Sequence, residues 1–302
     1  MPAMRQAARG RFIDTGTPRG YYVDYSRFAE RWASTELPPS PAELARLALG
    51  DLELYLARGT PQRRDRFARA VERLVRSVET IPGGFVGWAM TRVPGAYRGE
   101  LEEGWFCGRV HAECVSALLR AGTVLGDDAA VDTARAALGG FETPVEEGGF
   151  AREIAERGLE SGLESPLFIE SYPVSEPSLN LLGHTSAMLA VHDYGRLSEP
   201  ERAASLLTRL ASGLEYTLDR FDAGGWSLVD LDDRWSGRFL AGRALHREHI
   251  LHLEEVARLT TRSAFRKAAE RWRDHDARLL PRLRVLVGRV VFRMMNPGAP
   301  TG

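Results

Sequence analysis

Hydrophobic residues recur every three or four positions along most of the chain, which is the spacing of amphipathic helices. In 61–80, for example, Phe67, Val71 and Leu74 share one helical face. Prolines and glycines interrupt the pattern and set the expected boundaries. The pattern predicts helices at 41–58, 61–80, 105–122, 127–140, 179–196, 198–221, 241–259 and 262–279.

Short and long connections alternate between these predicted helices. Residues 83–104 and 140–177 are rich in glycine and proline and are expected to form loops. Helix pairs joined in this way suit a curved array whose long loops gather around one mouth. We therefore predict a mainly α fold, an α/α toroid or partial (α/α) barrel with a single central cavity. Residues 1–37 are expected to form an N-terminal arm and residues 38–302 the toroid domain.

Two helix starts carry capping signals. Ser178 precedes the 179–196 segment and is a plausible N-cap. Ser198, followed three residues later by Glu201, has the spacing of a capping box. Both serines are therefore expected to begin helices.

The C-terminal segment 278–296 mixes leucine and valine with Arg282, Arg284, Arg289 and Arg293. A basic amphipathic segment of this kind can lie on a membrane surface. The simpler expectation is a terminal helix that packs its valine and leucine face on the body.

Composition narrows the class of protein. The 302 residues are 44% hydrophobic and 27% charged, as in ordinary soluble domains. A net charge of −1 gives no field that attracts nucleic acid. No apolar run reaches the length of a membrane-spanning helix, and no signal peptide is recognisable. Cys107 and Cys114 are too far apart on one helix for a disulfide, and free thiols favour a cytoplasmic location.

The segment 168–194 carries the first candidate chemistry. Glu170 and Tyr172 precede a pair of prolines, and His184 is one of several polar residues in the helix that follows. A buried helix with so many polar groups either satisfies them internally or lines a cavity. A tyrosine acts as a base only where a nearby cation lowers its pKa, so packing of Tyr172 on the next helix stays an alternative.

Three further segments compete with this one. His111 and Glu113 lie on the 105–122 helix and either line a cavity or belong to the core. His246 and His249 are near neighbours on the 241–259 helix and could ligate a metal. Trp226 follows two glycines and could stack on a sugar or close a helix end.

Four blocks of the sequence, in the right order, resemble the C-terminal helical domain of D-glucuronyl C5-epimerases. ESYP followed by a Leu-Gly-His helix resembles the family's Glu-Tyr-Pro loop and Leu-Asn-Gly helix. GWFCGRVHAECVSALLRAG, FDAGGWSLVDLDDR and ALHREHILHLEEV resemble its Gln-Gly-Gln, Tyr-Asp-Leu-Arg and Tyr-His segments. The resemblance covers most of the chain after residue 38. It implies an α/α domain that acts on glucuronate units of heparan-type polysaccharides.

The sequence departs from the family at several chemical positions. Tyr172 matches the loop tyrosine, but Ser171 replaces the glutamate beside it, and Val229 and Leu245 replace the other two tyrosines. The two glutamines of the Gln-Gly-Gln segment become a histidine and a glutamate. These replacements indicate altered chemistry, since an imidazole or a carboxylate can accept and donate a proton more readily than the amide of a glutamine.

The sequence therefore predicts a C5-epimerase-like enzyme that abstracts a proton next to a carboxylate on a uronate or sugar-like molecule. The predicted catalytic residues are Tyr172, Glu170, His111 and His246. The predicted substrate-binding residues are Arg109, Glu113, His184, Trp226 and Arg247. This chemistry needs no cofactor, and the expected partner is a small molecule or glycan with a carboxylate. Homodimer formation is left open.

Two alternatives remain at this point. A metal-dependent enzyme on the same scaffold would bind a divalent ion through His111, Glu113, His246 and His249. A protein that binds a uronate or carbohydrate without turning it over would use the same cavity.

Overall fold

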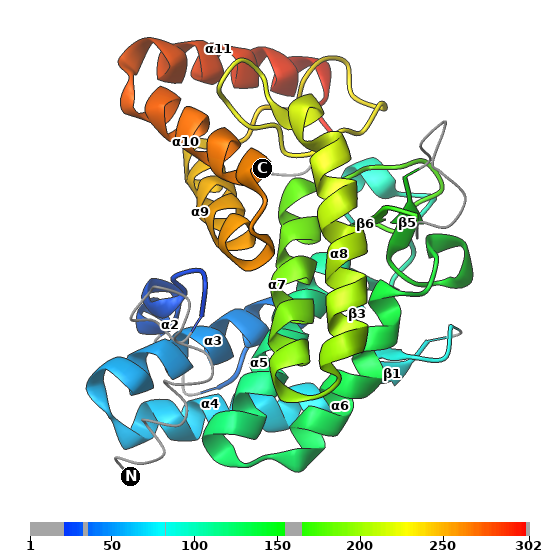
Figure 1. Ribbon diagram of the computed structural model, residues 1–302, viewed down its shortest axis with the longest axis vertical. Coiled ribbons are helices and arrows are strands. Elements are labelled where there is room, and N and C mark those ends of the chain that lie inside the picture. Colours follow the sequence, from blue (N-terminus) through cyan, green and yellow to red (C-terminus); the bar gives the residue numbers. More distant parts are fainter. Residues whose placement is uncertain (1–20, 33–35, 82, 155–164, 300–302) are drawn as a thin grey trace.

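The computed structural model describes residues 21–32, 36–81, 83–154 and 165–299 (Figure 1). The fold is mainly helical, as predicted, with a few short strands. Its α-helices within these ranges are α2 (Ser26–Arg31), α3 (Pro41–Arg58), α4 (Pro61–Arg76), α5 (Gly108–Leu125), α6 (Asp128–Leu138), α7 (Leu181–Leu197), α8 (Pro200–Thr217), α9 (Arg243–Thr260), α10 (Ser263–Ala277) and α11 (Leu279–Met295). Short 3-10 helices lie at Gly95–Tyr97, Gly139–Phe141, Val145–Glu147 and Leu218–Phe221.

The helices form two rows of consecutive partners. Helices α3, α5, α7 and α9 pack side by side in that order. Each of them packs against the helix that follows it in the chain, so α4, α6, α8 and α10 form the second row. The buried polar residues of the helices gather in the first row, where they include Asp51, His111, Glu113, His184, Asp193, His246 and His249. Closure of this array into a toroid and a single central cavity stay predictions.

The long connections contain antiparallel strand pairs. Strand β1 (Glu79–Thr80) pairs with β2 (Val86–Gly87), β3 (Ala89–Met90) pairs with β4 (Trp105–Phe106), and β5 (Ala151–Glu153) pairs with β6 (Leu167–Ile169). These pairs shorten two predicted helices, because 79–80 and 105–106 are strands. The predicted loops at 83–104 and 140–177 therefore have short regular elements.

Two predicted helix starts are wrong by two residues. Helix α7 is capped by Asn180, whose side chain accepts a hydrogen bond from the Gly183 backbone, and not by Ser178. Helix α8 begins at Pro200, with Glu199 as its cap residue and no side-chain capping bond. Proline at the first helical position has its φ already set for a helix, and this outweighs the capping-box signal of Ser198.

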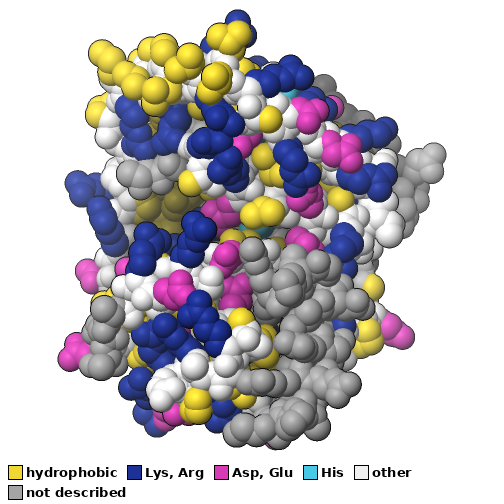
Figure 2. Space-filling view, turned by 90° about the vertical axis from the view of Figure 1, so that its left-hand side faces the viewer, with side chains coloured by type: hydrophobic (Ala, Val, Ile, Leu, Met, Phe, Trp, Pro, Cys, Tyr) yellow, Lys and Arg dark blue, Asp and Glu magenta, His cyan; other side chains and the backbone are white. Residues whose placement is uncertain are grey.

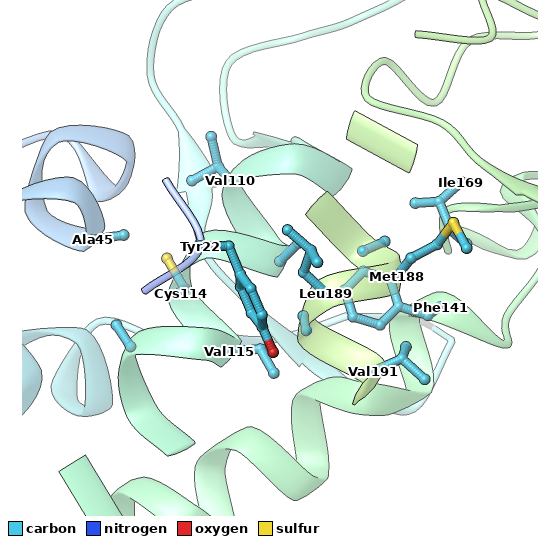
Figure 3. Packing of buried hydrophobic residues seen from close by; sticks show 14 of the residues in the cluster. Tyr22, Ala45, Val110, Cys114, Val115, Phe141, Ile169, Met188, Leu189 and Val191 are labelled. Atoms are coloured by element: carbon cyan, nitrogen blue, oxygen red, sulfur yellow. The ribbon is translucent and has the colours of Figure 1, made fainter. Parts of the chain in front are cut away.

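The core lies between α5 and α7 and is mostly apolar. Figure 3 shows part of this cluster, with the Tyr22 ring beside Val115 of α5 and Met188 of α7 next to Ile169. One buried ion pair crosses it, because Arg120 Nη1 lies 2.5 Å from Asp193 Oδ2. A buried pair of this kind is costly to break, because either partner left alone is an uncompensated charge.

Helix α11 does not pack as predicted. Only Val285 and Phe292 of its side chains are buried, and Phe292 stacks on Phe239 with ring centroids 4.5 Å apart. Its other large apolar residues are exposed: Leu279, Leu280, Leu283, Leu286, Val287, Val290, Val291, Met294 and Met295. The prediction of a terminal helix with its valine and leucine face on the body is therefore wrong for most of that face.

Candidate functional site

The segment after β6 is held by Glu170. This side chain is fully buried, and its carboxylate accepts hydrogen bonds from Arg152 Nε (2.9 Å), the Ser178 hydroxyl (2.7 Å) and the Leu179 backbone N–H (2.9 Å). The bonds close the Ser171–Ser178 loop on itself. Gly108 allows α5 to press against this loop, because a Cβ at residue 108 would overlap the Glu170 carbonyl oxygen.

These contacts suit Glu170 to a positioning role, and the catalytic role expected from the sequence stays a prediction. Burial raises the pKa of Glu170 even though Ser178 and Arg152 oppose this by hydrogen bonds and charge. Its hydrogen-bond donors hold the carboxylate in place. The side chain fixes where the next residues point.

Tyr172 projects from this loop into an aromatic stack. Its ring lies 4.5 Å from the Tyr97 ring and 5.7 Å from the Trp105 ring, nearly parallel to both. Such offset stacks are favourable and fix the plane of the ring. Burial raises the pKa of the Tyr172 phenol, as do the charges of Cys107 and Asp230, whereas Arg109 lowers it. The phenol therefore stands in the field of Asp230 and of one arginine.

Asp230 is a buried acid beside this stack. Its Oδ1 accepts a hydrogen bond from Trp235 Nε1 at 2.9 Å, and its Oδ2 is buried without a hydrogen-bond partner among the described residues. Burial and the nearby Asp232 carboxylate raise the pKa of Asp230 to about 8. A carboxyl with this pKa can accept or donate a proton near neutral pH.

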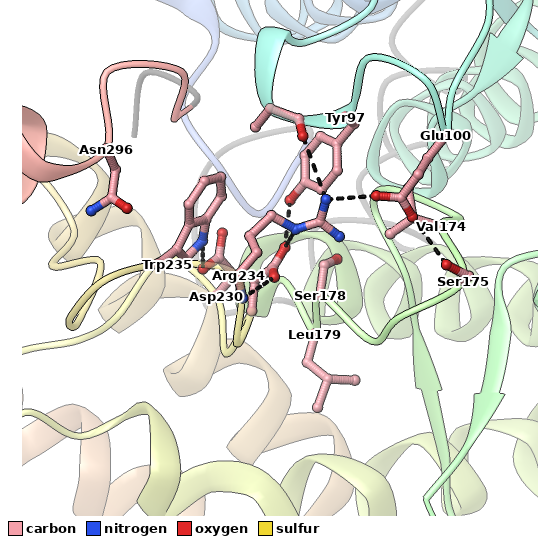
Figure 4. A network of polar contacts seen from close by, with 12 residues as sticks. Tyr97, Glu100, Val174, Ser175, Ser178, Leu179, Asp230, Arg234, Trp235 and Asn296 are labelled. Carbon is pink, nitrogen blue, oxygen red and sulfur yellow. Dashed lines mark hydrogen bonds and ion pairs between the residues drawn. The ribbon is translucent and has the colours of Figure 1, made fainter.

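A second network holds the other side of the stack (Figure 4). The Tyr97 hydroxyl donates to Asp232 at 3.1 Å, and Arg234 donates to the same carboxylate at 2.6 Å. Arg234 also lies 4.5 Å above the Tyr97 ring and pairs with Glu100 at 2.8 Å. Asp232, Arg234 and Glu100 also line a cleft of about 630 Å³. The loops at 91–104 and 222–242 thus meet beside Tyr172.

Arg109 and Glu113 form an ion-pair chain between helices. Glu113 accepts from Arg46 on α3, from Arg109 one turn earlier on α5, and from the Tyr25 hydroxyl, each at 3.0 Å. Arg109 also donates to Glu248 on α9 at 3.0 Å. Burial alone would raise the pKa of Glu113, but the two arginines outweigh it and hold the pKa below its usual range. Glu113 is therefore an anion that fixes Arg109.

His249 on α9 presents a free ring nitrogen. His246 Nδ1 accepts from both the backbone N–H and the hydroxyl of Ser227, at 3.1 and 2.8 Å. The Ser227 oxygen then accepts from His249 Nδ1 at 2.9 Å. In this tautomer His249 Nε2 is an unprotonated acceptor, and it is buried without a partner among the described residues. Burial lowers the pKa of His249, so the ring is neutral.

His252, one turn further along α9, repeats this arrangement. Thr185 donates its hydroxyl to the Leu181 carbonyl at 3.0 Å and accepts from His252 Nδ1 at 2.9 Å. The Nε2 atom of His252 is again buried and unpartnered within the described part of the chain. Burial, helped by the Arg109 charge, lowers the pKa of His252 to about 3.

These groups share one region of the molecule. The Arg109 charge acts on Tyr172, His249 and His252, and the Asp230 charge acts on Tyr172. The candidate site is therefore Tyr172, Asp230, Arg109, His249 and His252. The face of the molecule seen in Figure 2 is hollowed at mid-height, with hydrophobic side chains inside and arginines around the rim.

Sequence reasoning found three of these residues and missed two. Asp230 lies in the VDLDDR segment, where the residue that departs from the family's pattern is its neighbour Val229. His252 follows His249 at the same three-residue spacing as His246, so the repeat was the available signal. Neither pattern shows which side chain has an unpartnered atom.

His111 lies in an aromatic cage away from this group. Its ring contacts those of Phe85, Trp88, Phe141 and Phe150, with centroids between 4.9 and 6.0 Å. Its Nε2 donates to the Ala137 carbonyl at 2.7 Å, and burial lowers its pKa to about 4. The imidazole is thus packed in the core, with its Nδ1 buried and without a hydrogen-bond partner among the described residues, and its catalytic role stays a prediction.

His246 and Trp226 pack on each other. Their rings stack with centroids 3.9 Å apart, and the Trp226 indole donates to the Ala241 carbonyl at 2.9 Å. Both side chains are buried, so the tryptophan offers no exposed face for a sugar. Burial lowers the pKa of His246 to about 4. His246 supports His249 through Ser227.

The other predicted binding residues also have structural partners. His184 accepts from the Ile169 backbone N–H at 2.9 Å and donates to the Leu210 carbonyl at 3.0 Å, so both ring nitrogens are used. Arg247 is exposed and pairs with Asp276 at 2.7 Å. In the described ranges, no three His, Cys, Asp or Glu side chains are arranged to hold a metal ion. The predicted ligand set of His111, Glu113, His246 and His249 is therefore not assembled.

The fold and the site define a helical domain with a cluster of buried polar residues, some of which lie on the long loops between the helices. The family described as D-glucuronyl C5-epimerase C-terminus matches residues 84–274, and the chain belongs to this family. The match includes every residue of the candidate site. It confirms the resemblance predicted from the sequence.

Two relatives show how far the similarity extends. The chain is 26% identical over 175 residues to the uncharacterized protein MJ1128 of Methanocaldococcus jannaschii, a match that covers 58% of this chain and 53% of that protein. It is also similar in fold to the Lin0763 protein from Listeria innocua, with a TM-score of 0.56 and 15% identity over 82% of this chain and 63% of that one. The chain thus spans about half the length of the curated relative it matches. No described helix is long and apolar enough to cross a membrane.

Proposed function

We propose that this protein is an isomerase of the C5-epimerase type, which inverts the carbon next to the carboxylate of a uronate. Asp230 carries the proposal, because it is a buried carboxyl with an unpartnered oxygen and a pKa raised to about 8, close to Tyr172. Inversion needs one group that removes a proton and another that delivers a proton to the opposite face. Two groups of suitable chemistry stand together here.

In the proposed reaction, Asp230 as the carboxylate accepts the proton from C5. The C–H bond breaks, an O–H bond forms on Asp230, and the substrate carboxylate becomes an enolate. Tyr172 then gives its phenolic proton to C5 from the other face and becomes a phenolate. Proton exchange with solvent returns both groups to their starting states.

Arg109 supports both charges of this reaction. Its guanidinium already lowers the pKa of Tyr172, so it stabilises the phenolate. A cation beside the reacting carboxylate also stabilises the enolate that develops there. Glu113 and Glu248 hold the guanidinium in place from α5 and α9.

His249 and His252 are proposed to bind hydroxyl groups of the sugar. Each offers a buried Nε2 acceptor without a partner among the described residues. An unsatisfied buried acceptor costs about 1–3 kcal/mol, which a substrate hydroxyl would recover on binding. The Arg109 charge acts on both rings, which supports a shared role with the cation that would hold the carboxylate.

The test is epimerisation of a glucuronate oligosaccharide of the heparan type, followed by NMR. We expect Tyr172→Phe and Asp230→Asn to lose at least about a hundredfold in kcat, since each removes a proton-transfer group. Tyr55→Phe is the matched control, because Tyr55 lies on α3, outside the candidate site and outside the cleft beside it. Full turnover in either site variant would remove that residue from the mechanism.

A further inference from the structure

The outer face of helix α11 is an exposed apolar stripe. Of its large apolar side chains, Met294 is 79% exposed, Leu279 72% and Val287 63%. The hydrophobic side chains gather at the top of the face seen in Figure 2, over the position of α11 in Figure 1. A contiguous patch of this kind is typical of a surface that contacts a partner or a membrane.

The stripe points away from the body. At about 100° per residue, Leu283, Val287 and Met294 lie opposite the buried Val285 and Phe292. The helix is nevertheless firmly attached. Phe292 stacks on Phe239, as described above. Two hydrogen bonds also tie the ends of the helix to neighbouring segments: Arg282 donates to the Asp276 carbonyl at 2.6 Å, and Asn296, just after the helix, accepts from the Ser236 backbone N–H at 3.0 Å.

Positive charge borders the stripe on both sides. At the same angular spacing, Arg282, Arg289 and Arg293 lie on one edge, between the stripe and the body, and Arg284 lies on the other edge. From Leu279 to the end of the chain there is no aspartate or glutamate. The helix therefore has a net charge of +4, and its arginines lie along the two borders of the apolar stripe.

We infer that α11 docks this protein on an anionic lipid surface. An amphipathic helix lies in the plane of a membrane when its apolar face can enter the acyl boundary and its basic residues can meet the headgroups. Arginine stems pass along the apolar part while the guanidinium groups stay in the polar layer. The apolar stripe with arginines at its borders matches this arrangement, and anionic headgroups neutralise the arginines.

A second copy of the chain suits the stripe less well. Symmetric pairing of two α11 helices would bring the same basic edges together. The helix has no carboxylate of its own, although Arg282 lies 3.8 Å from the Asp276 carboxylate of α10. Like charges facing each other across an interface oppose association, whereas a lipid surface supplies the missing negative charge.

Vesicle flotation of the full chain tests the inference. Phosphatidylcholine vesicles are compared with vesicles that also contain phosphatidylserine, at low and at physiological ionic strength. We expect binding to the anionic vesicles that is at least about tenfold tighter and that weakens as salt is added. Leu283→Gln with Val290→Gln should reduce this binding at least about tenfold, because it removes apolar groups that enter the bilayer.

Two further variants separate the contributions. Arg284→Gln should weaken binding to anionic vesicles about fivefold and leave binding to neutral ones unchanged. Leu251→Gln, a 40% exposed leucine on α9, is the matched control and should bind like the wild type. Unfolding curves confirm that every variant folds.

Four results would overturn the inference. The first is no binding to either kind of vesicle, and the second is equal binding by the wild type and the double variant. The third is a vesicle-free dimer, measured by light scattering, that the double variant converts into a monomer, since α11 would then contact a second copy. Binding indifferent to phosphatidylserine would refute the anionic assignment.

Discussion

Replacement of Asp230 by asparagine should make the protein more stable at high pH. The carboxyl has a folded-state pKa of about 8, against 3.8 for the unperturbed group. The folded state therefore holds a proton that the unfolded state releases, and stability falls as pH rises between these two values. Asparagine is neutral throughout and can keep the bond from Trp235, so its stability does not follow this slope.

The expected size follows from the two pKa values. Each pKa unit is worth about 1.36 kcal/mol, so the gap between 3.8 and about 8 corresponds to roughly 6 kcal/mol at full deprotonation. Below pH 4 the protonated acid and the amide should be nearly equal in stability. Between pH 5 and 9 the advantage of Asp230→Asn should grow by about 4 kcal/mol. Urea unfolding at pH 5, 7 and 9, followed by circular dichroism, measures this difference.

Asp222→Asn is the control with the opposite sign. Burial would raise the pKa of Asp222, but hydrogen bonds from Gly225, Trp272 and Arg271 outweigh it and lower the pKa. That carboxylate contributes stability above its unfolded pKa, so its loss should cost a constant amount from pH 5 to 9. A stability difference for Asp230→Asn that does not change over this range would refute the proton-holding role.

Three other predictions can be checked with the same preparations. Activity in the direction in which Asp230 accepts the proton should rise with pH through about 8, and this limb of the kcat/KM profile should be missing in Asp230→Asn. Glu170→Gln should cost about 2–3 kcal/mol in urea unfolding, because it removes the buried charge that holds Arg152 and the loop. His111→Phe should cost about 1–2 kcal/mol through the lost bond to Ala137 while kcat stays near the wild-type value, which a turnover assay decides.

The helical periodicity was sufficient to predict most of the fold. Helix α3 occupies the predicted range, and α9 and α10 begin and end within two residues of theirs. The errors in the predicted boundaries fall where the backbone preference of a proline or the pairing of two strands overrides the helical pattern of hydrophobic residues. Proline at residue 200 sets the start of α8, and pairing with another strand converts residues 105–106 from helix to strand.

The site was harder to predict because a motif does not show what surrounds a side chain. His111 has the spacing of a cavity residue on α5, but rings from four distant positions enclose it. Glu170 has the position of a catalytic acid, but donors from Arg152 and Ser178 occupy it. Asp230 differs from both, because one of its carboxylate oxygens is buried without a hydrogen-bond partner among the described residues. Only the three-dimensional arrangement reveals this.

The central claim is proton transfer at the carbon next to a carboxylate, and solvent exchange tests it most directly. The wild-type protein is incubated in D₂O with the glucuronate oligosaccharide, and deuterium at C5 is followed by NMR. We predict incorporation by the wild type and by Tyr55→Phe, and none by Asp230→Asn, which lacks the group that removes the C5 proton. If the oligosaccharide binds, as measured by calorimetry, and C5 keeps its proton, the protein is a carbohydrate-binding protein and the epimerase account is wrong.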